Sequence, residues 1–83
     1  MYLYSMDKEN KTKIAKFIKM QRIAQDLKQD ELAKNAGLSS KTLQHIENAK
    51  DVRDSSIDKA LSALGYKVLQ KVVIEIIPLE ESY

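Results

Sequence analysis

Two short amphipathic segments joined by a single glycine constrain the fold of this chain more than any other feature. Residues 29–36 read QDELAKNA, Gly37 follows, and Ser39 stands directly before SKTLQHIEN. Glycine ends a helix in the left-handed conformation without steric cost, and serine caps a helix N-terminus well. The spacing therefore predicts helices over 29–36 and 40–48 with a tight turn between them, which is a helix-turn-helix.

Two further helices flank this motif. Ile14, Phe17, Ile18, Ala24 and Leu27 recur at roughly helical spacing and predict a helix over about 12–26, with Thr12 as its N-cap. The stretch SSIDKALSALG predicts the fourth helix. Its start is marked by the Ser55 and Asp58 capping signal, and Gly65 ends it.

The composition changes after Gly65. YKVLQKVVIEII is rich in β-branched residues, alternates with a period of two and stops before Pro78, so it predicts one strand over 67–77. A single apolar strand leaves its backbone edge unpaired, and a symmetric dimer solves this by pairing the strand with its own copy. The alternative is that residues 1–5 fold back and pair with it. The predicted dimerisation residues are Val68, Val72, Val73, Ile74 and Ile76.

The length of 83 residues is that of one small domain. The expected fold is mostly α, a compact four- to five-helix domain with a helix-turn-helix plus one C-terminal strand paired across a homodimer. Its predicted parts are a leader over 1–11, a DNA-binding domain over 12–66, a dimerisation strand over 67–77 and an acidic tail over 78–83.

The charge is distributed unevenly. Residues 1–74 hold all 14 Lys and Arg but 9 of the 12 acidic residues, a net +5, and the remaining three acids lie in residues 75–83. A basic body with an acidic tail favours a polyanionic partner such as nucleic acid, although an ordinary solvated surface is also compatible with it.

Catalytic and metal sites are not expected. The chain has no cysteine, one histidine and two isolated glycines, so it carries no common metal, thiol or phosphate-loop motif. We therefore expect a non-enzyme without a cofactor. No apolar run approaches the roughly 20 residues of a membrane span, and the N-terminus lacks a secretory pattern, so a cytoplasmic protein without a membrane partner is expected.

The predicted helix 40–48 has a face suited to reading DNA. Leu43 and Ile46 turn inward, which leaves lysine and glutamine outward, and these side chains bond guanine and adenine edges in the major groove. The predicted base contacts are Ser40, Lys41, Gln44 and His45. For the lone histidine, a solvated residue without a role is an equally acceptable interpretation.

The sequence QDELAKNAGLSSKTLQHIENAK resembles the helix-turn-helix of Cro/repressor-type (Xre family) proteins. Their pattern is Gln-x-Glu-Leu-Ala, a glycine turn, and a helix ending Ile-Glu-x-Gly-Lys, and the likeness covers about 12–66. The resemblance implies that the second motif helix enters the major groove. The residues themselves predict phosphate contacts at Gln29, Asn48, Lys50 and Arg53, and the resemblance implies phosphate-facing positions at Gln29, Ser39, Thr42, Asn48 and Lys50.

The same resemblance implies a structural ion pair between Arg22 and Glu47. This pair would connect the first helix to the helix over 40–48, which we call the reading helix because its exposed face is the one predicted to contact bases. Three positions depart from the family pattern. Lys28 removes a side-chain N-cap, Asp26 replaces a common glycine, and Ala49 replaces the glycine after the reading helix, where a positive φ would strain alanine.

The strand that follows the fourth helix is similar to that of HipB-like antitoxins, which are dimers of this family. This implies a dimeric, sequence-specific repressor that binds a palindromic double-stranded operator and a toxin encoded alongside. Two alternatives remain open: a protein-interaction module that chiefly neutralises a partner protein, and a stand-alone phage or plasmid repressor.

Overall fold

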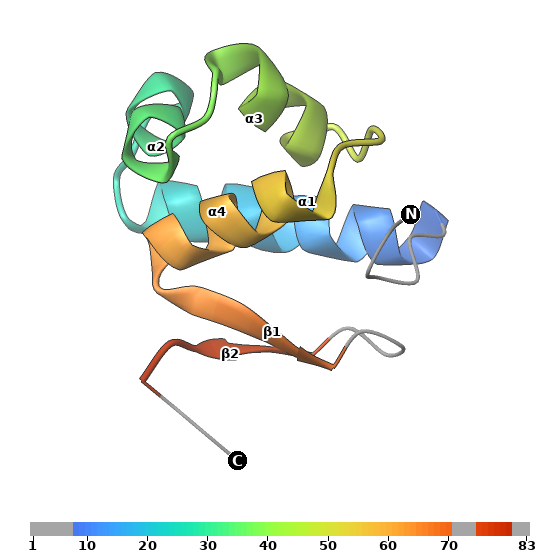
Figure 1. The fold of residues 1–83 in the computed structure, drawn as a ribbon. Helices are drawn as coiled ribbons and strands as arrows, with labels where there is room; N and C mark the ends of the chain where they lie inside the picture. The colour runs from blue at the N-terminus through green and yellow to red at the C-terminus, as the bar shows by residue number, and fades with distance from the viewer. Residues whose placement is uncertain (1–7, 71–74, 81–83) are drawn as a thin grey trace.

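A computed structural model of the chain describes residues 8–70 and 75–80. Within them lie the helices α1 (Lys8–Ala24), α2 (Gln29–Ala36), α3 (Ser40–Glu47) and α4 (Asp54–Leu64), followed by the strands β1 (Tyr66–Gln70) and β2 (Glu75–Pro78). Helices α2 and α3 lie on one side of the α1–α4 pair and the two strands on the other (Figure 1). The mostly helical fold with a helix-turn-helix is confirmed.

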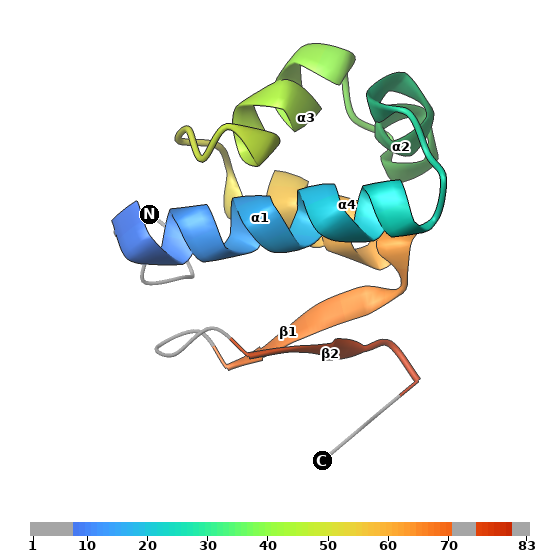
Figure 2. The same ribbon diagram turned by 180° about the vertical axis from the view of Figure 1, so that it is seen from behind.

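One hydrophobic core joins all four of these helices, and α1 and α4 run side by side through its middle, as the view from behind also shows (Figure 2). Phe17 on α1 meets Tyr66 on β1 edge to face with ring centroids 4.9 Å apart, which attaches the strands to the helical body. The buried cluster consists of Ile14, Ile18, Leu32, Ala33, Leu43, Ile46, Ile57, Ala60, Leu61 and Leu64.

Each of the four helices is followed by a residue in the left-handed conformation. Gly37 (φ 72°) and Gly65 (φ 95°) adopt it as the sequence predicts, and Asp26 and Ala49 adopt it with φ 58° each. After α3, the N–H of Lys50 donates to the carbonyl of His45 at 2.9 Å, which closes a Schellman motif around Ala49. The positive φ expected at Ala49 is therefore present, and alanine carries its steric cost.

The predicted ends of two helices need correction. Helix α1 begins at Lys8, so Thr12 lies inside the helix and residues 8–11 belong to it instead of to a leader. The lysines and the glutamate of KENK are good helix formers, which agrees with this earlier start. Helix α4 begins at Asp54 with Arg53 at the N-cap, so Ser55 stands in the first turn and does not cap it.

The single strand predicted over 67–77 is wrong. Residues 66–70 and 75–78 form two antiparallel strands that pair with each other, with Tyr66 opposite Pro78 and Val68 opposite Ile76. Val68 and Ile76 share a face and pack against the core of their own chain. The other predicted dimerisation residues, Val72, Val73 and Ile74, lie outside the described residues, as does the alternative partner over residues 1–5.

Among the helices of the described ranges, none combines the length and the apolar character that crossing a membrane requires.

Candidate nucleic-acid interface

Helix α3 has one buried and one exposed face. Leu43 is fully buried and Ile46 is 3% exposed, and both belong to the core. On the opposite face Ser40, Lys41 and Gln44 are exposed, whereas His45 is half-buried. The structure thus brings three of the four predicted base-contact residues together on one outward surface, one helical turn long. Side chains of this kind at the start of an exposed helix can reach base edges.

The start of α3 is fixed by Ser39. Its hydroxyl accepts a hydrogen bond from the Thr42 N–H at 3.1 Å and donates one to the Thr42 hydroxyl at 2.9 Å. This is the N-cap arrangement expected from the sequence. Both residues were predicted to contact phosphate, and their hydroxyl groups lie at the N-terminal end of α3, where backbone N–H groups favour an anion.

The predicted ion pair between Arg22 and Glu47 is present. Arg22 Nε donates to Glu47 Oε2 at 2.8 Å, and Arg22 Nη2 donates to Glu47 Oε1 at 3.2 Å. Arg22 Nη1 also donates to the carbonyl of Leu27 at 2.8 Å. The Glu47 side chain is 2% exposed and that of Arg22 13%, so water barely screens the pair. This bidentate pair holds the end of α3 against α1 and against the turn that follows α1.

Gln29, predicted to contact a phosphate, also has a hydrogen-bond partner within the chain. Its side-chain Nε2 donates to Glu47 Oε1 at 3.1 Å, and the residue is half-buried. Gln29 is the first residue of α2, preceded by Lys28, whose N–H donates to Glu31 Oε1 at 2.9 Å. Lys28 makes no side-chain cap, as its replacement of serine or threonine implied, and Glu31 compensates from within the first turn.

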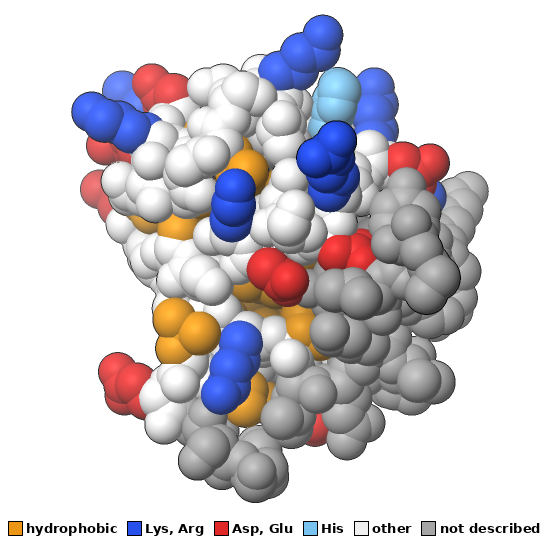
Figure 3. All heavy atoms as spheres, in the orientation of Figure 1, with side chains coloured by type: hydrophobic (Ala, Val, Ile, Leu, Met, Phe, Trp, Pro, Cys, Tyr) orange, Lys and Arg blue, Asp and Glu red, His pale blue; other side chains and the backbone are white. Residues whose placement is uncertain are grey.

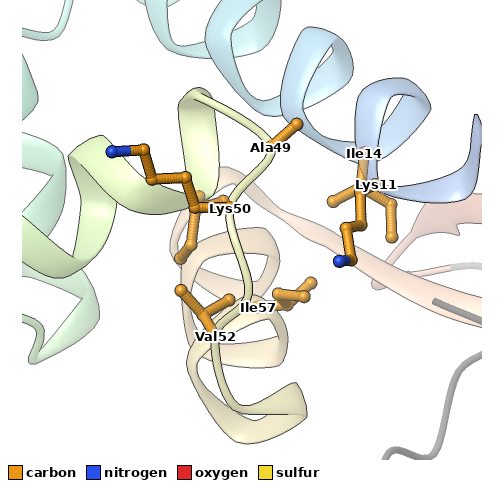
Figure 4. Close-up of a pocket in the computed structure, with 7 residues that line it drawn as sticks. Lys11, Ile14, Ala49, Lys50, Val52 and Ile57 are labelled. Atoms are coloured by element: carbon orange, nitrogen blue, oxygen red, sulfur yellow. The ribbon is translucent and has the colours of Figure 1, made fainter. Parts of the chain in front are cut away.

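The loop between α3 and α4 carries the remaining predicted phosphate contacts, Asn48, Lys50 and Arg53, and all three are exposed. Val52 holds this loop on the body by packing against the core, and Lys11 Nζ on α1 forms an ion pair with Asp51 Oδ1. A small hollow lies under the loop, and Figure 4 shows the Lys50 side chain extending away from Lys11 toward α3. The loop thus presents its cations beside the reading helix.

Positive charge gathers on this side of the molecule. In Figure 3, several Lys and Arg side chains lie around the single histidine at the upper right of the surface, whereas at the upper left, where α2 lies, acidic side chains stand among the basic ones. Such a concentration of cations over a helix-turn-helix is the electrostatic footprint of a nucleic-acid interface.

Two contacts that shape this interface were not anticipated from the sequence. Lys11 and Asp51 are 40 positions apart, and the Gln29–Glu47 hydrogen bond joins residues 18 positions apart. No local sequence pattern predicts which of these distant residues will meet, because charged and amide side chains are frequent on any helix surface. Gln29 matched a motif position, but a motif does not say which side chain its amide meets.

Comparison with known proteins agrees with this geometry. A family model described as helix-turn-helix (HTH_3) matches residues 18–70, which is more than half of the chain. A search of curated proteins found no match.

Proposed function

This chain belongs to the helix-turn-helix (HTH_3) family of Cro/repressor-type (Xre) DNA-binding transcription regulators, and from that premise we propose that it is a sequence-specific repressor that binds a palindromic operator as a homodimer. The observation that carries the proposal is the exposed face of α3, where Ser40, Lys41 and Gln44 stand clear of the core. This face would lie in the major groove, with His45 at its edge.

Phosphate contacts would hold the reading helix in register on the duplex. The side chains proposed for this flank α3 on both sides, and phosphate contacts position a protein without reading sequence. At one side stands the start of α2, and at the other the loop after α3. The proposed set is Gln29, Ser39, Thr42, Asn48, Lys50 and Arg53.

The test is a binding experiment on duplexes selected from a random pool by the unmodified protein. Changing Lys41→Ala and Gln44→Ala together removes two base-reading side chains without touching the core, so we expect the variant to lose its preference for the selected duplex over random DNA. Lys59→Ala with Ser62→Ala is the matched control, since these residues have the same spacing on the exposed side of α4. Full specificity in the Lys41/Gln44 variant would refute the assignment of α3.

The proposed homodimer would place two α3 helices on half-sites about 34 Å apart, or a multiple of this distance. Support comes from the hairpin: among the described residues β1 and β2 form a two-stranded sheet, and the outer edge of such a sheet is the kind of edge that a second copy could pair with. Two hairpins joined edge to edge about a two-fold axis would make one four-stranded sheet. Sedimentation equilibrium of the full chain tests this, and a monomer at every concentration would rule the dimer out.

One observation favours a second role, neutralisation of a toxin protein encoded alongside. Met20 and Ile23 are one turn apart on α1 and are 58% and 59% exposed, so the two neighbouring apolar side chains could serve a protein contact. We expect Met20→Lys with Ile23→Lys to abolish co-purification with the product of the adjacent reading frame while leaving DNA binding intact. If the unmodified pair does not co-purify, the antitoxin role is rejected and repression stands alone.

A further inference from the structure

The side chain of Gln29 forms a hydrogen bond with Glu47, which lies at the other end of the helix-turn-helix. Its Nε2 donates to Glu47 Oε1 at 3.1 Å, and the same oxygen accepts Arg22 Nη2 at 3.2 Å. A carboxylate only accepts hydrogen bonds, so the amide must present its N–H to Glu47. The contact joins the first residue of α2 to the last residue of α3.

This contact completes the surroundings of a buried charge. The Glu47 side chain is 2% exposed, and a buried carboxylate is costly unless it is paired with a positive charge and hydrogen-bonded. Arg22 donates one hydrogen bond to each carboxylate oxygen, and Gln29 adds a second donor on Oε1. Three helices therefore meet at one carboxylate, with α1 contributing Arg22, α2 contributing Gln29 and α3 contributing Glu47 itself.

We propose that Gln29 is a positioning residue that sets α3 relative to α2, in addition to any contact it makes with DNA. A primary amide has two N–H groups, and the one bonded to Glu47 leaves the other for a phosphate oxygen. A phosphate held at the start of α2 would then be linked through a single side chain to the angle at which α3 enters the groove. This inference rests on the proposed DNA-binding function.

The two roles of Gln29 lead to different measurable losses. A residue that only contacts phosphate weakens binding uniformly, whatever the base sequence. A residue that positions α3 weakens the selected duplex more than random DNA, because base-edge contacts depend on accurate placement and phosphate contacts tolerate small shifts. The ratio of the two affinities therefore separates positioning from phosphate contact.

The first experiment compares Gln29→Ala with Lys50→Ala on the selected and the random duplex at one salt concentration. Lys50 is the matched control, since it is also proposed to contact phosphate but is an exposed residue of the loop after α3. We expect Gln29→Ala to lower the affinity ratio by about tenfold, comparable to one mismatched base pair, and Lys50→Ala to leave it within about twofold. Equal ratios in the two variants would overturn the proposal.

The second experiment needs no DNA and so separates this proposal from the proposed function. We expect backbone amide NMR signals of residues 44–47 to shift in free Gln29→Ala and to stay in place in Lys28→Ala, whose side chain is exposed and adjacent. Unmoved α3 signals in Gln29→Ala would overturn the positioning role even if the protein binds DNA well. Failure of the unmodified protein to bind any duplex would instead refute the proposed function.

Discussion

At the scale of single residues, Glu47 connects three helices through one buried carboxylate. It is almost fully buried and bonds both Arg22 and Gln29. Removing one partner of a buried ion pair leaves the other charge uncompensated, which costs about 3–5 kcal/mol. The carboxylate was recognisable from the sequence as a partner of Arg22, because both occupied motif positions of the family.

We expect Glu47→Gln to lower the free energy of unfolding by about 3 kcal/mol, because it keeps the shape of the side chain but removes the charge that compensates Arg22. Urea denaturation measures this. Asp51→Asn is the matched control: the Asp51 side chain is 66% exposed, so neutralising its pair with Lys11 is expected to cost less than about 1 kcal/mol. Equal losses in the two variants would contradict the buried role of Glu47.

We expect Ala49→Gly to raise the free energy of unfolding by up to about 1 kcal/mol, because Ala49 holds φ 58° and its Cβ opposes that conformation. Ala36→Gly provides the opposite sign, since Ala36 is the last residue of α2 and glycine there is expected to cost up to about 0.5 kcal/mol, less than the roughly 0.5–1 kcal/mol of a helix interior. Chemical denaturation of both variants gives the comparison. A loss of stability in Ala49→Gly would show that the cost at this position is entropic and not steric.

At the scale of the elements, the two ends of α3 are fixed by different means. Ser39 caps the start through the Thr42 N–H, and the Schellman motif around Ala49 closes the end. Helix α4 lacks a side-chain cap, although the sequence offers Ser55 as a candidate. Comparing substitutions of the two serines therefore shows whether a serine near a helix start stabilises the helix only when it makes the capping hydrogen bond.

We expect Ser39→Ala to destabilise the protein by about 1 kcal/mol, because the Thr42 N–H loses its acceptor. Ser55→Ala should change stability by less than about 0.5 kcal/mol, since an exposed position inside a first turn has no capping bond to lose. Thermal unfolding of the two variants side by side measures the difference. A larger loss from Ser55→Ala would place the N-cap of α4 where the sequence put it.

The elements differ in how far the sequence predicts them. Helices α2 and α3 were predicted to within one residue, because Gly37 and Ser39 leave little freedom for where a helix ends and begins. The strands were misread. Residues 67–77 are rich in β-branched residues throughout, and no glycine, proline, asparagine or aspartate lies between Gln70 and Glu75 to indicate a turn. A two-residue period of apolar side chains indicates which face of a sheet each residue occupies. It does not indicate whether the chain turns back within the segment.

At the scale of the whole molecule, the charge distribution governs how DNA affinity depends on salt. The basic body of residues 1–74 faces a polyanion whose bound counterions are released on binding. The proposed phosphate contacts bring cations from the loop after α3, and the base face adds Lys41. Affinity measured without a stated ionic strength would therefore say little about this protein.

We expect the logarithm of DNA affinity to fall linearly with the logarithm of salt concentration, and Lys50→Ala to reduce the slope by about one for each subunit bound. Lys59→Ala on α4 is the control and should leave the slope unchanged, because this lysine lies outside the proposed interface. Fluorescence anisotropy between about 50 and 200 mM salt gives both slopes. Identical slopes in the Lys50 variant and the unmodified protein would exclude Lys50 from the interface.

The exposed face of α3 has a consequence for how this protein can be changed. Ser40, Lys41 and Gln44 stand outside the core, whereas Leu43, Ile46 and Glu47 on the same helix hold it in place. Substitutions in the first group do not disturb the packing of the core. The loss of stability that usually accompanies a new function is therefore not expected there. On the proposed assignment of the base contacts, exchanging these three side chains on an unchanged scaffold would redirect the protein to another DNA sequence.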